Sequence, residues 1–438
     1  MLEKKRVLII SGEAWRDESN GGNVLTNLFT PLMDEFEFAQ IYTNPQMPNN
    51  SVCKRYYHIS EAEVIKSFLT RKPFGNRLEL LTYNTDIKSQ EKNISLEVSA
   101  LTKLKRLNFA IFHTIQDVIW RLSKWKTPEL EQFIREYNPD IIFAPMYYSL
   151  FIHRIDRYVA KLTGKKVISY VSDDHLTYRQ FSLSPIYWFN RFMLRRNVIK
   201  TAKYYSLLYT MTNEQKEEYE DVLKIPMKVL KKTGDFTVKP LPRINLNEPL
   251  VITYGGNLIS NRQKTLGALA SAIQKINKDS VKIILNIYTQ SYVDDKTKSL
   301  LHDGRSSFLN GKITMAELHE KYKESDILLH VESFDLKPRL ETRLSFSTKI
   351  IDLLNAYRCV MAICWKESSP YLYLKSENAA ICISDIDLLQ QELEYLLINR
   401  QTLQEYAEKA WDCGVRNHQK DIVIKDLKDD FNNILSKI

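Results

Sequence analysis

Two pairs of adjacent glycines each follow an apolar run, in a chain with only 12 glycines among 438 residues. Gly21 and Gly22 follow the run RVLIIS near the N-terminus, and Gly255 and Gly256 follow the run PLVITY. Because glycine has no Cβ, the backbone there can approach a ligand closely or adopt a positive φ. A plain tight turn would explain each pair equally well, so the pairs gain weight only from their neighbours.

Basic residues follow the second glycine pair at the start of a predicted helix. Arg262 and Lys264 lie in the first turn of a helical pattern over 262–278. A helix start presents unbonded N–H groups and the positive end of the helix dipole. Cations beside such a helix start predict a site for an anion such as phosphate.

A second helix start, near residues 345–352, has the same chemistry. Ser347 and Thr348 directly precede Lys349. Serine and threonine at a helix start normally cap it, but a lysine in the first turn opposes the helix dipole unless an anion compensates it. We therefore predict that Ser347, Thr348 and Lys349 contact phosphate. Asp352, one turn further on, either forms a surface ion pair or holds the two hydroxyls of a ribose.

A polar loop in the first half of the chain carries candidates for acid–base chemistry. The segment SDDHLTYR at 172–179 follows an apolar run, so Asp174 and His175 lie at the carboxyl end of a predicted strand. A carboxylate or an imidazole there can orient an acceptor hydroxyl or take its proton. The alternative is that the loop only caps the next helix.

The sequence predicts no metal site. Its one D-x-D motif, Asp385 to Asp387, stands where a predicted strand gives way to a helix, so we expect these residues to cap that helix. His330 lies within a predicted strand, which favours a structural role, and the other histidines lack the spacing of metal ligands. We expect neither a metal nor a bound cofactor.

Short apolar runs alternate with helical patterns, which predicts βαβ units and parallel sheets. In such sheets ligands bind beyond the carboxyl ends of the strands, where most of these candidate residues lie. The predicted strands are 6–11, 38–43, 140–145, 166–172, 205–211, 249–254, 281–289, 326–332, 358–364 and 379–384. The predicted helices include one after Gly22 and 149–163, 185–202, 212–223, 262–278, 314–323, 347–356 and 385–397.

A polar stretch with three prolines, residues 232–249, separates two series of strands and is typical of a linker. We therefore predict an α/β fold with two doubly wound, Rossmann-like domains. The first domain covers 1–238 and the second covers 239–416. The chain beyond these strands is nearly all helical, and we expect a C-terminal helix at about 417–438 to pack back on the first domain.

These features together resemble the GT-B fold glycosyltransferases, and most of all glycosyltransferase family 4. The resemblance spans nearly the whole chain. It rests on Gly21 and Gly22 after the first strand, on YGGN at 254–257 and, most specifically, on FSTKIIDLLNAYRCVMAI at 346–363. The resemblance implies transfer of a sugar from a nucleotide-sugar donor, with retention at the anomeric carbon. Cations and N–H groups would stabilise the leaving diphosphate without a metal.

The resemblance also implies roles for the candidate residues. The first domain would lie on the acceptor side, with Gly21 and Gly22 lining a central cleft that the two domains face, and the second would bind the donor. Asp352 takes the position where the family usually has a glutamate for the ribose. The donor diphosphate would be held by Gly255 and Gly256 with Arg262 or Lys264, and from the other side by Ser347, Thr348 and Lys349.

Two positions depart from the family pattern. Asn257 stands where the family often has an arginine after the glycine. Leu344 occupies the position of the first of the family's two glutamates. Glu332, Asp335 and Glu341 remain open alternatives for that acid.

The amino-acid composition limits the classes of binding partner and the cellular compartment that we expect. The net charge of +9 arises from 62 basic and 53 acidic residues, which favours an anionic partner without choosing one. No aromatic–basic motif of a nucleic-acid-binding module is present, so we expect no nucleic acid. Five cysteines without a C-x-x-C motif favour reduced thiols. The apolar runs are too short for a membrane span or a secretory signal, so we expect a cytoplasmic protein.

Two basic, amphipathic segments predict contact with a membrane. Residues 101–126 hold six basic residues against one acid, and residues 189–203 hold five basic residues and no acid. Such helices suit an anionic lipid surface, and ordinary packing on the domain is the alternative. The sequence thus predicts peripheral attachment to the inner face of the membrane.

The predicted function is sugar transfer from a UDP- or GDP-linked donor to a lipid-linked or glycan acceptor, in surface polysaccharide or glycolipid synthesis. Two alternatives stay open. One is a nucleotide-sugar epimerase on the same fold. The other is a catalytically inactive, membrane-associated nucleotide-binding module.

Overall fold

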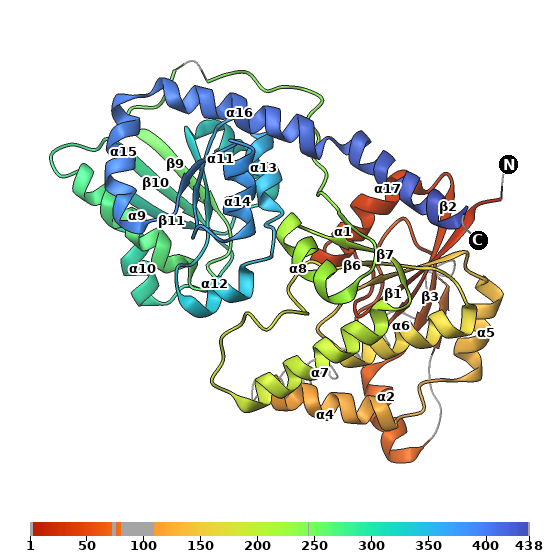
Figure 1. The fold of residues 1–438 in the computed structure, drawn as a ribbon. Coiled ribbons are helices and arrows are strands. Elements are labelled where there is room, and N and C mark those ends of the chain that lie inside the picture. Colours follow the sequence, from red (N-terminus) through yellow and green to blue (C-terminus); the bar gives the residue numbers. More distant parts are fainter. Residues whose placement is uncertain (1–2, 72–75, 80–108, 244, 437–438) are drawn as a thin grey trace, which may run out of the picture. The chain divides into compact units, whose positions relative to one another are not determined.

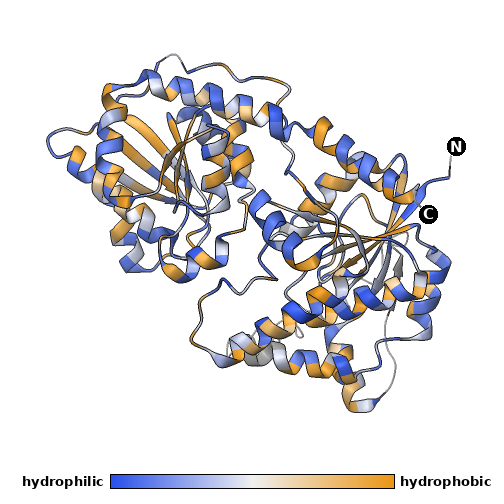
Figure 2. Ribbon diagram, in the orientation of Figure 1, coloured by the Kyte–Doolittle hydropathy of each residue, from blue (hydrophilic) through white to orange (hydrophobic). Residues whose placement is uncertain are grey.

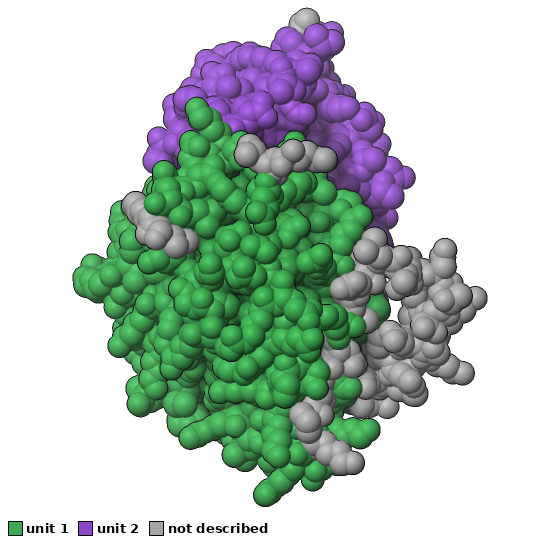
Figure 3. Space-filling view, turned by 90° about the vertical axis from the view of Figure 1, so that its right-hand side faces the viewer, with its two compact units in different colours: residues 1–178, 182–229, 424–438 green, residues 179–181, 230–423 purple. Residues whose placement is uncertain are grey.

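Two compact α/β units make up the protein in the computed structural model, which describes residues 3–71, 76–79, 109–243 and 245–436. Each unit is built around one predominantly parallel sheet, so the predicted class of two doubly wound α/β domains is confirmed. Unit 1 comprises residues 1–178, 182–229 and 424–438, and unit 2 comprises residues 179–181 and 230–423 (Figure 1, Figure 3).

The sheet of unit 1 has the strand order β4-β3-β2-β1-β5-β6-β7-β8. Neighbouring strands are parallel except β3 and β4. The apolar run of β1 is fully buried, as expected for a central strand covered on both faces. The strands are β1 Lys5–Ser11, β2 Phe36–Tyr42, β3 Arg55–His58, β4 Asn76–Glu79, β5 Ile141–Pro145, β6 Val167–Tyr170, β7 Tyr205–Thr210 and β8 Met227–Val229.

Helices of unit 1 flank this sheet, and the last helix of the chain joins them (Figure 1). Phe431 of that helix lies in the aromatic core, with its ring 6.1 Å from the ring of Phe29 and 5.7 Å from that of Phe36. The helices are α1 Asn20–Phe29, α2 Glu61–Thr70, α4 Phe109–Leu122, α5 Pro128–Tyr137, α6 Leu150–Thr163, α7 Pro185–Ala202, α8 Asn213–Leu223 and α17 Lys420–Leu435, with a short 3-10 turn, η1, at Thr30–Leu32.

The sheet of unit 2 is wholly parallel, in the order β11-β10-β9-β12-β13-β14. Successive residues of a strand point to opposite faces. Ile327 and Leu328 of β12 accordingly belong to different apolar clusters, one on each face of the sheet. The strands are β9 Leu250–Gly255, β10 Ile283–Tyr288, β11 Ser307–Gly311, β12 Ile327–Val331, β13 Cys359–Ile363 and β14 Ile381–Ile383.

The helices of unit 2 divide between the two faces. Residues of α9 and α15 fill one cluster, and residues of α11, α13 and α16 fill the other. Figure 2 shows hydrophobic strands at the centre and helices of mixed hydropathy around them. The helices are α9 Arg262–Ile276, α10 Asp295–Leu301, α11 Met315–Glu324, α12 Leu336–Thr342, α13 Lys349–Asn355, α14 Ser369–Ser376, α15 Leu389–Ile398 and α16 Gln401–His418, with a 3-10 turn, η3, at Ile386–Leu388.

Two features differ from the sequence prediction. The prediction omitted the short strands β3, β4, β8 and β11 and the helices α2, α5, α10, α12 and α14. It also placed Gly21 and Gly22 in a loop before a helix. They lie instead inside the first turn of α1, which begins at Asn20 and is capped by the side chain of Ser19.

Membrane-spanning helices are not found among the residues that the structure describes, because none of their helices is both long and apolar enough. The predicted basic segment 101–126 is described only from residue 109, and Lys103, Lys105 and Arg106 lie outside the described residues.

Candidate functional site

The strand order of unit 2 points to the place where a ligand would bind. Strands β9 and β12 are neighbours, and the strands that follow each of them lie on opposite sides. At such a topological switch point, the loops beyond the carboxyl ends of the two strands form the usual ligand site of an open α/β sheet. Gly255 ends β9, and Glu332 directly follows β12.

The two glycines after β9 serve different neighbours. A Cβ on Gly255 would lie 2.5 Å from the Tyr322 hydroxyl and 2.7 Å from Leu318, so this glycine lets α11 pack closely on the strand. A Cβ on Gly256 would lie 2.7 Å from the Lys349 ammonium nitrogen. The N–H of Gly256 donates to the Tyr288 carbonyl at 2.9 Å, so it continues the sheet. Gly256 thus makes room for Lys349.

Arg262, in the first turn of α9, is held by Glu332. Its Nε and Nη2 atoms donate to the Glu332 carboxylate at 3.1 and 2.9 Å. The Glu332 residue is only 4% exposed. Burial raises the pKa of Glu332, with Arg262 and Lys349 acting in the opposite direction. This side-on pair fixes the guanidinium plane at the switch point.

Lys264 is also neutralised within unit 2. Its ammonium lies 2.5 Å from an Asp335 carboxylate oxygen, which also accepts a hydrogen bond from the Asn261 side chain at 2.8 Å. Asp335 precedes α12 and therefore places its negative charge at the start of α9. Two of the three predicted phosphate-binding cations are therefore already paired.

Lys349 is the cation that stays without a partner among the described residues. No hydrogen bond or ion pair of its ammonium is found there, and the side chain is partly buried. Burial and the nearby Arg262 lower the pKa of Lys349, against the opposing effects of Asp352 and Glu332. Desolvation of an unpaired cation costs free energy, which a bound anion would recover.

The start of α13 leaves hydroxyl groups beside this cation. Thr348 is the N-cap residue, yet its side chain makes no capping hydrogen bond. Ser347 contributes its carbonyl to the turn, as acceptor for the Ile350 N–H at 3.1 Å. The alternative that Thr348 only caps the helix is thus not supported, and phosphate contact by Ser347 and Thr348, which precede Lys349 in the chain, stays a prediction.

Asp352, the predicted ribose ligand, lies on α13 and forms an ion pair with Lys232 at 3.7 Å. Lys232 also donates to the Thr348 carbonyl at 2.8 Å. Both side chains of the pair are about a quarter exposed, at 27%. The surface ion pair that the sequence allowed is thus present, and a ribose contact stays a prediction.

Glu332, Asp335 and Glu341, the alternatives for the family's first glutamate, differ in their burial and in their partners. Glu341 is exposed and lies 3.7 Å from Lys337 on the same helix, α12. Asp335 pairs with Lys264. Glu332 alone of the three is buried at the switch point, where it also lies 3.7 Å from His330. Burial lowers the pKa of His330 to about 3, so this imidazole is neutral at physiological pH.

In unit 1 the predicted catalytic loop follows β6. Asp174 is buried, and its carboxylate accepts hydrogen bonds from the Leu176 and Thr177 N–H groups at 3.0 and 2.9 Å. It also lies 2.9 Å from Arg191 Nη2. Burial acts to raise the pKa of Asp174, but Arg191 and these hydrogen bonds lower it overall. The geometry makes Asp174 an organiser of its loop, and a role in proton transfer stays a prediction.

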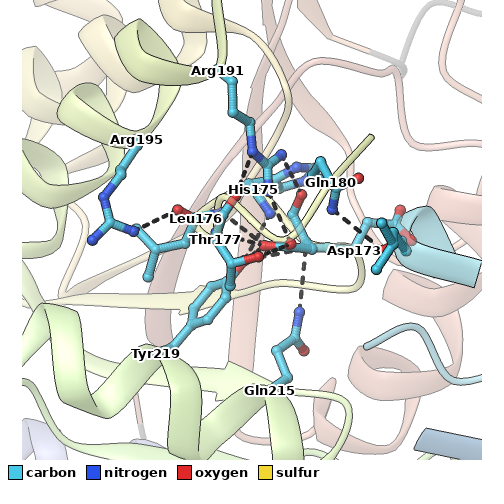
Figure 4. A network of polar contacts seen from close by, with 11 residues as sticks. Asp173, His175, Leu176, Thr177, Gln180, Arg191, Arg195, Gln215 and Tyr219 are labelled. Atoms are coloured by element: carbon cyan, nitrogen blue, oxygen red, sulfur yellow. Dashed lines mark hydrogen bonds and ion pairs between the residues drawn. The ribbon is translucent and has the colours of Figure 1, made fainter. Parts of the chain in front are cut away.

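Two helices clamp this loop (Figure 4). From α7, Arg191 donates to the carbonyls of Thr177 and Asp174, both at 2.7 Å, and Arg195 donates to the Leu176 carbonyl at 2.7 Å. From α8, the Tyr219 hydroxyl accepts from the His175 N–H at 2.7 Å. These supports carry no signal in the sequence, because arginines in a basic segment are typical of an exposed surface.

His175 is held in a fixed place by this clamp. Its ring is buried near Tyr148, with 6.0 Å between the ring centroids, and no partner for its Nδ1 is found within the described parts of the chain. Burial lowers the pKa of His175, so the neutral imidazole can accept a proton. His175 therefore keeps the chemistry of a general base, and its catalytic role stays a prediction.

The first glycine pair has a local reason. A Cβ on Gly22 would lie 2.0 Å from the Arg16 carbonyl oxygen, which no side chain can tolerate. A Cβ on Gly21 would lie 3.1 Å from a Glu13 carboxylate oxygen. Close packing of α1 on the preceding loop explains Gly22, and the predicted contact of both glycines with a ligand stays a prediction.

Solved structures share this fold over the whole chain. HepE of Anabaena in complex with UDP has a TM-score of 0.61 at 11% identity, covering 98% of this chain and 100% of that chain. Sucrose-phosphate synthase of Thermosynechococcus elongatus has the same TM-score and identity, covering 99% and 100%. The trehalose 6-phosphate synthase of Burkholderia multivorans has a TM-score of 0.58 at 9% identity, covering 99% and 98%. The chain has the GT-B fold.

At these identities the likeness establishes the GT-B fold and leaves the reaction to the site itself. No protein-family model and no curated protein sequence matches the chain. Within the described part of this GT-B chain, no group of three or more histidine, cysteine, aspartate or glutamate side chains is arranged to hold a metal. Asp385 of the D-x-D motif caps η3 by accepting from the Asp387 N–H at 3.0 Å, as predicted.

Proposed function

We propose that this protein transfers a glycosyl group from a nucleotide-sugar donor to an acceptor hydroxyl. The observation that carries the proposal is the partly buried ammonium of Lys349 at the switch point of unit 2, which has no hydrogen-bond or ion-pair partner among the residues that the structure describes. The GT-B fold supports it, because the structural neighbours include HepE in complex with UDP and with UDP-glucose.

The proposed reaction needs positive charge from the protein beside the leaving group. Glycosyl transfer releases a nucleoside diphosphate, and cations fixed before the reaction stabilise the negative charge that develops on it. Lys349 would bind the diphosphate, with the hydroxyls of Ser347 and Thr348 beside it. Arg262 would contribute the Nη1 atom, because Nε and Nη2 are engaged by Glu332. His175 would take the proton of the acceptor hydroxyl.

The finer assignments follow the family resemblance. We propose a UDP- or GDP-linked donor, retention at the anomeric carbon, and catalysis without a metal. The acceptor would be lipid-linked or a growing glycan, in synthesis of a surface polysaccharide or glycolipid. The protein would act at the inner face of the membrane, which its basic helices support.

A donor screen tests the proposal. The protein is incubated with UDP- and GDP-sugars and an extract of lipid-linked and glycan acceptors, and both the released nucleoside diphosphate and the glycosylated product are measured. We expect a product with one donor and its loss in Lys349→Ala. Formation of a free epimer without transfer would favour the epimerase alternative. The absence of any donor consumption would count against an enzyme of this class.

A further inference from the structure

Three neighbouring helices of unit 1, α2, α4 and α7, form one layer. Helix α4 lies between the other two: Thr114 of α4 hydrogen-bonds Asn190 of α7 at 2.9 Å. The Lys124 N–H, just after α4, donates to the Ser67 hydroxyl of α2 at 3.2 Å. Figure 1 shows α7 and α4 side by side, with α2 at the end of α4. We call the solvent-facing side of this layer the α2–α4–α7 face.

Helix α4 turns its polar contacts inward and an apolar stripe outward. Asp117 pairs with Arg154 of α6 at 2.7 Å, and Trp120 stacks on Phe151 of the same helix, with the ring centroids 4.2 Å apart. The residues on the opposite side of α4 recur at helical spacing and are exposed, Leu122 by 60%. They are Ile115, Val118 and Leu122.

Helix α7 is divided in the same way. Its inner side holds Arg191, which is 2% exposed and clamps the 174–177 loop. Its outer side carries Ile186, Phe189 and Phe192, with Phe189 exposed by 54%. At 100° per residue, these three positions share one arc with Arg196 and Lys200 further along the helix. The outer face of α7 thus runs from apolar to basic.

Helix α2 extends the apolar surface. Its buried residues Val64 and Ser67 face inward, whereas Ile65, Phe68 and Leu69 are exposed, Leu69 by 73%. Nine large apolar side chains on three packed helices exceed the scattered exposure that is normal for a soluble surface. Exposed apolar side chains gathered on three packed helices indicate an interaction surface.

The exposed charges of this layer have one sign. On the parts of α2, α4 and α7 whose side chains the structure describes, every charged side chain in the exposed class is basic. The acids of these helices are Glu61 and Glu63 at the start of α2 and the ion-paired Asp117. The exposed basic residues are Lys66, Arg121, Arg196 and Lys200.

We propose that the α2–α4–α7 face docks on an anionic lipid bilayer. Phenylalanine and aliphatic side chains would enter the acyl boundary while the four cations meet the headgroups, the arrangement of interfacial helices. A second copy of this chain fits less well, because a symmetric dimer through this face would set like charges against each other. The docking needs no nucleotide, and only the statement that the acceptor lies in that membrane rests on the proposed function.

Flotation with defined vesicles tests the docking. The full-length protein is mixed with vesicles of phosphatidylcholine alone, or of phosphatidylcholine and phosphatidylglycerol in equal parts. We expect flotation with the anionic vesicles, weakened by salt because the cations are screened. Arg196→Glu and Lys200→Glu should each lower the partition coefficient about fivefold or more, from the value of one basic residue at an anionic surface. Phe189→Ser with Phe192→Ser should abolish flotation.

Matched controls lie in unit 2. Lys298→Glu changes an exposed lysine of α10, and Ile398→Ser changes an exposed isoleucine, and both variants should float like the wild type. Circular dichroism and UDP titration confirm that each variant is folded and show whether nucleotide binding, a separate property, is retained. The proposal is overturned if the wild type ignores both vesicles or if the variants float unchanged. A dimer that the phenylalanine substitutions dissolve would assign the face to a second copy instead.

Discussion

The charges at the switch point of unit 2 act through particular partners. Arg262 and Glu332 share a buried, two-point ion pair, and Lys264 shares an exposed one with Asp335. The Lys349 ammonium has no hydrogen-bond or ion-pair partner among the described residues, so it can bind an anionic ligand. Among the described residues, the carboxyl edge of this sheet therefore holds the Lys349 ammonium without a partner beside a guanidinium that Glu332 fixes.

Breaking the buried pair should be costly, and removing both partners should not. Glu332→Leu or Arg262→Met should each lower the free energy of unfolding by about 3–5 kcal/mol, because a buried charge is left alone. The double variant should lie closer to the wild type than either single variant. Urea unfolding measures all four proteins. A double variant as unstable as the sum of the two single losses would contradict the pairing.

At this scale the sequence predicted the cations but not their partners. Lys349 could be identified from its unfavourable place in the first turn of a helix. Glu332 and Asp335 lie about seventy residues from Arg262 and Lys264, and only the parallel pairing of β9 with β12 brings them together. A single sequence carries no signal for such long-range pairs.

Helix α7 joins two surfaces of unit 1 through its two sides. The inner side fixes the loop that carries Asp174 and His175, and the outer side belongs to the α2–α4–α7 face. The helix is therefore neither wholly buried nor an ordinary amphipathic surface helix.

Two arginines on opposite sides of α7 make a matched pair of tests. Arg191→Met removes three contacts to the 174–177 loop and leaves the Asp174 carboxylate buried without its cation. We expect unit 1 to lose about 3–5 kcal/mol of unfolding free energy. Arg196→Met changes the same residue type on the exposed side and should leave stability nearly unchanged. Equal effects of the two substitutions on thermal unfolding would refute the clamp.

The central strands could be predicted from the sequence, whereas most edge strands, and β3 beside one of them, could not. Strands such as β1 and β13 are continuous apolar runs, because both faces of a central parallel strand are buried. β8 has three residues and β3 reads RYYH, so neither has a run or an alternation long enough to detect. Because glycine is unfavourable inside helices, the sequence predicts Gly22 in a loop. In the structure Gly22 lies in the first turn of α1 and lets this helix pack on the Arg16 backbone.

Both units have a predominantly parallel sheet flanked by helices, and the alternation of apolar runs and helical patterns in the sequence predicts this architecture. The switch points follow from the strand order, which the sequence does not state. Secondary-structure propensities do not determine the order of the strands in a sheet or which loops meet at the carboxyl ends of those strands. The GT-B architecture could be predicted from the resemblance to the family, whose most specific part is the segment 346–363.

Acid should destabilise the whole molecule through its buried histidines. Burial lowers the pKa of His58 and His418 to about 4, and that of His153 and His330 to about 3. The unfolded chain protonates these groups near pH 6.5, so stability is lost as the pH falls from about 6.5 through 4. A histidine pKa lowered from 6.5 to about 4 corresponds to a loss of about 3 kcal/mol by that pH.

The histidine with two hydrogen bonds offers the sharpest check on this pH dependence. The Nδ1–H of the neutral His418 ring donates to the Lys232 carbonyl at 2.8 Å, and its Nε2 accepts from the Tyr373 hydroxyl at 2.6 Å. His418→Gln keeps an amide donor and acceptor but cannot titrate. Its free energy of unfolding, measured against pH, should fall less steeply below pH 6.5 than that of the wild type. An unchanged slope would show that His418 is not involved.

Calorimetric titration with UDP and GDP tests the central claim, that a nucleoside diphosphate binds at the switch point of unit 2. We expect the wild type to bind one of the two nucleotides. Lys349→Ala should weaken that binding about tenfold to a hundredfold, the value of a charge-assisted hydrogen bond. Lys298→Ala, in an exposed position of the same unit, should bind like the wild type. Binding of neither nucleotide, or equal binding by wild type and Lys349→Ala, would contradict the claim.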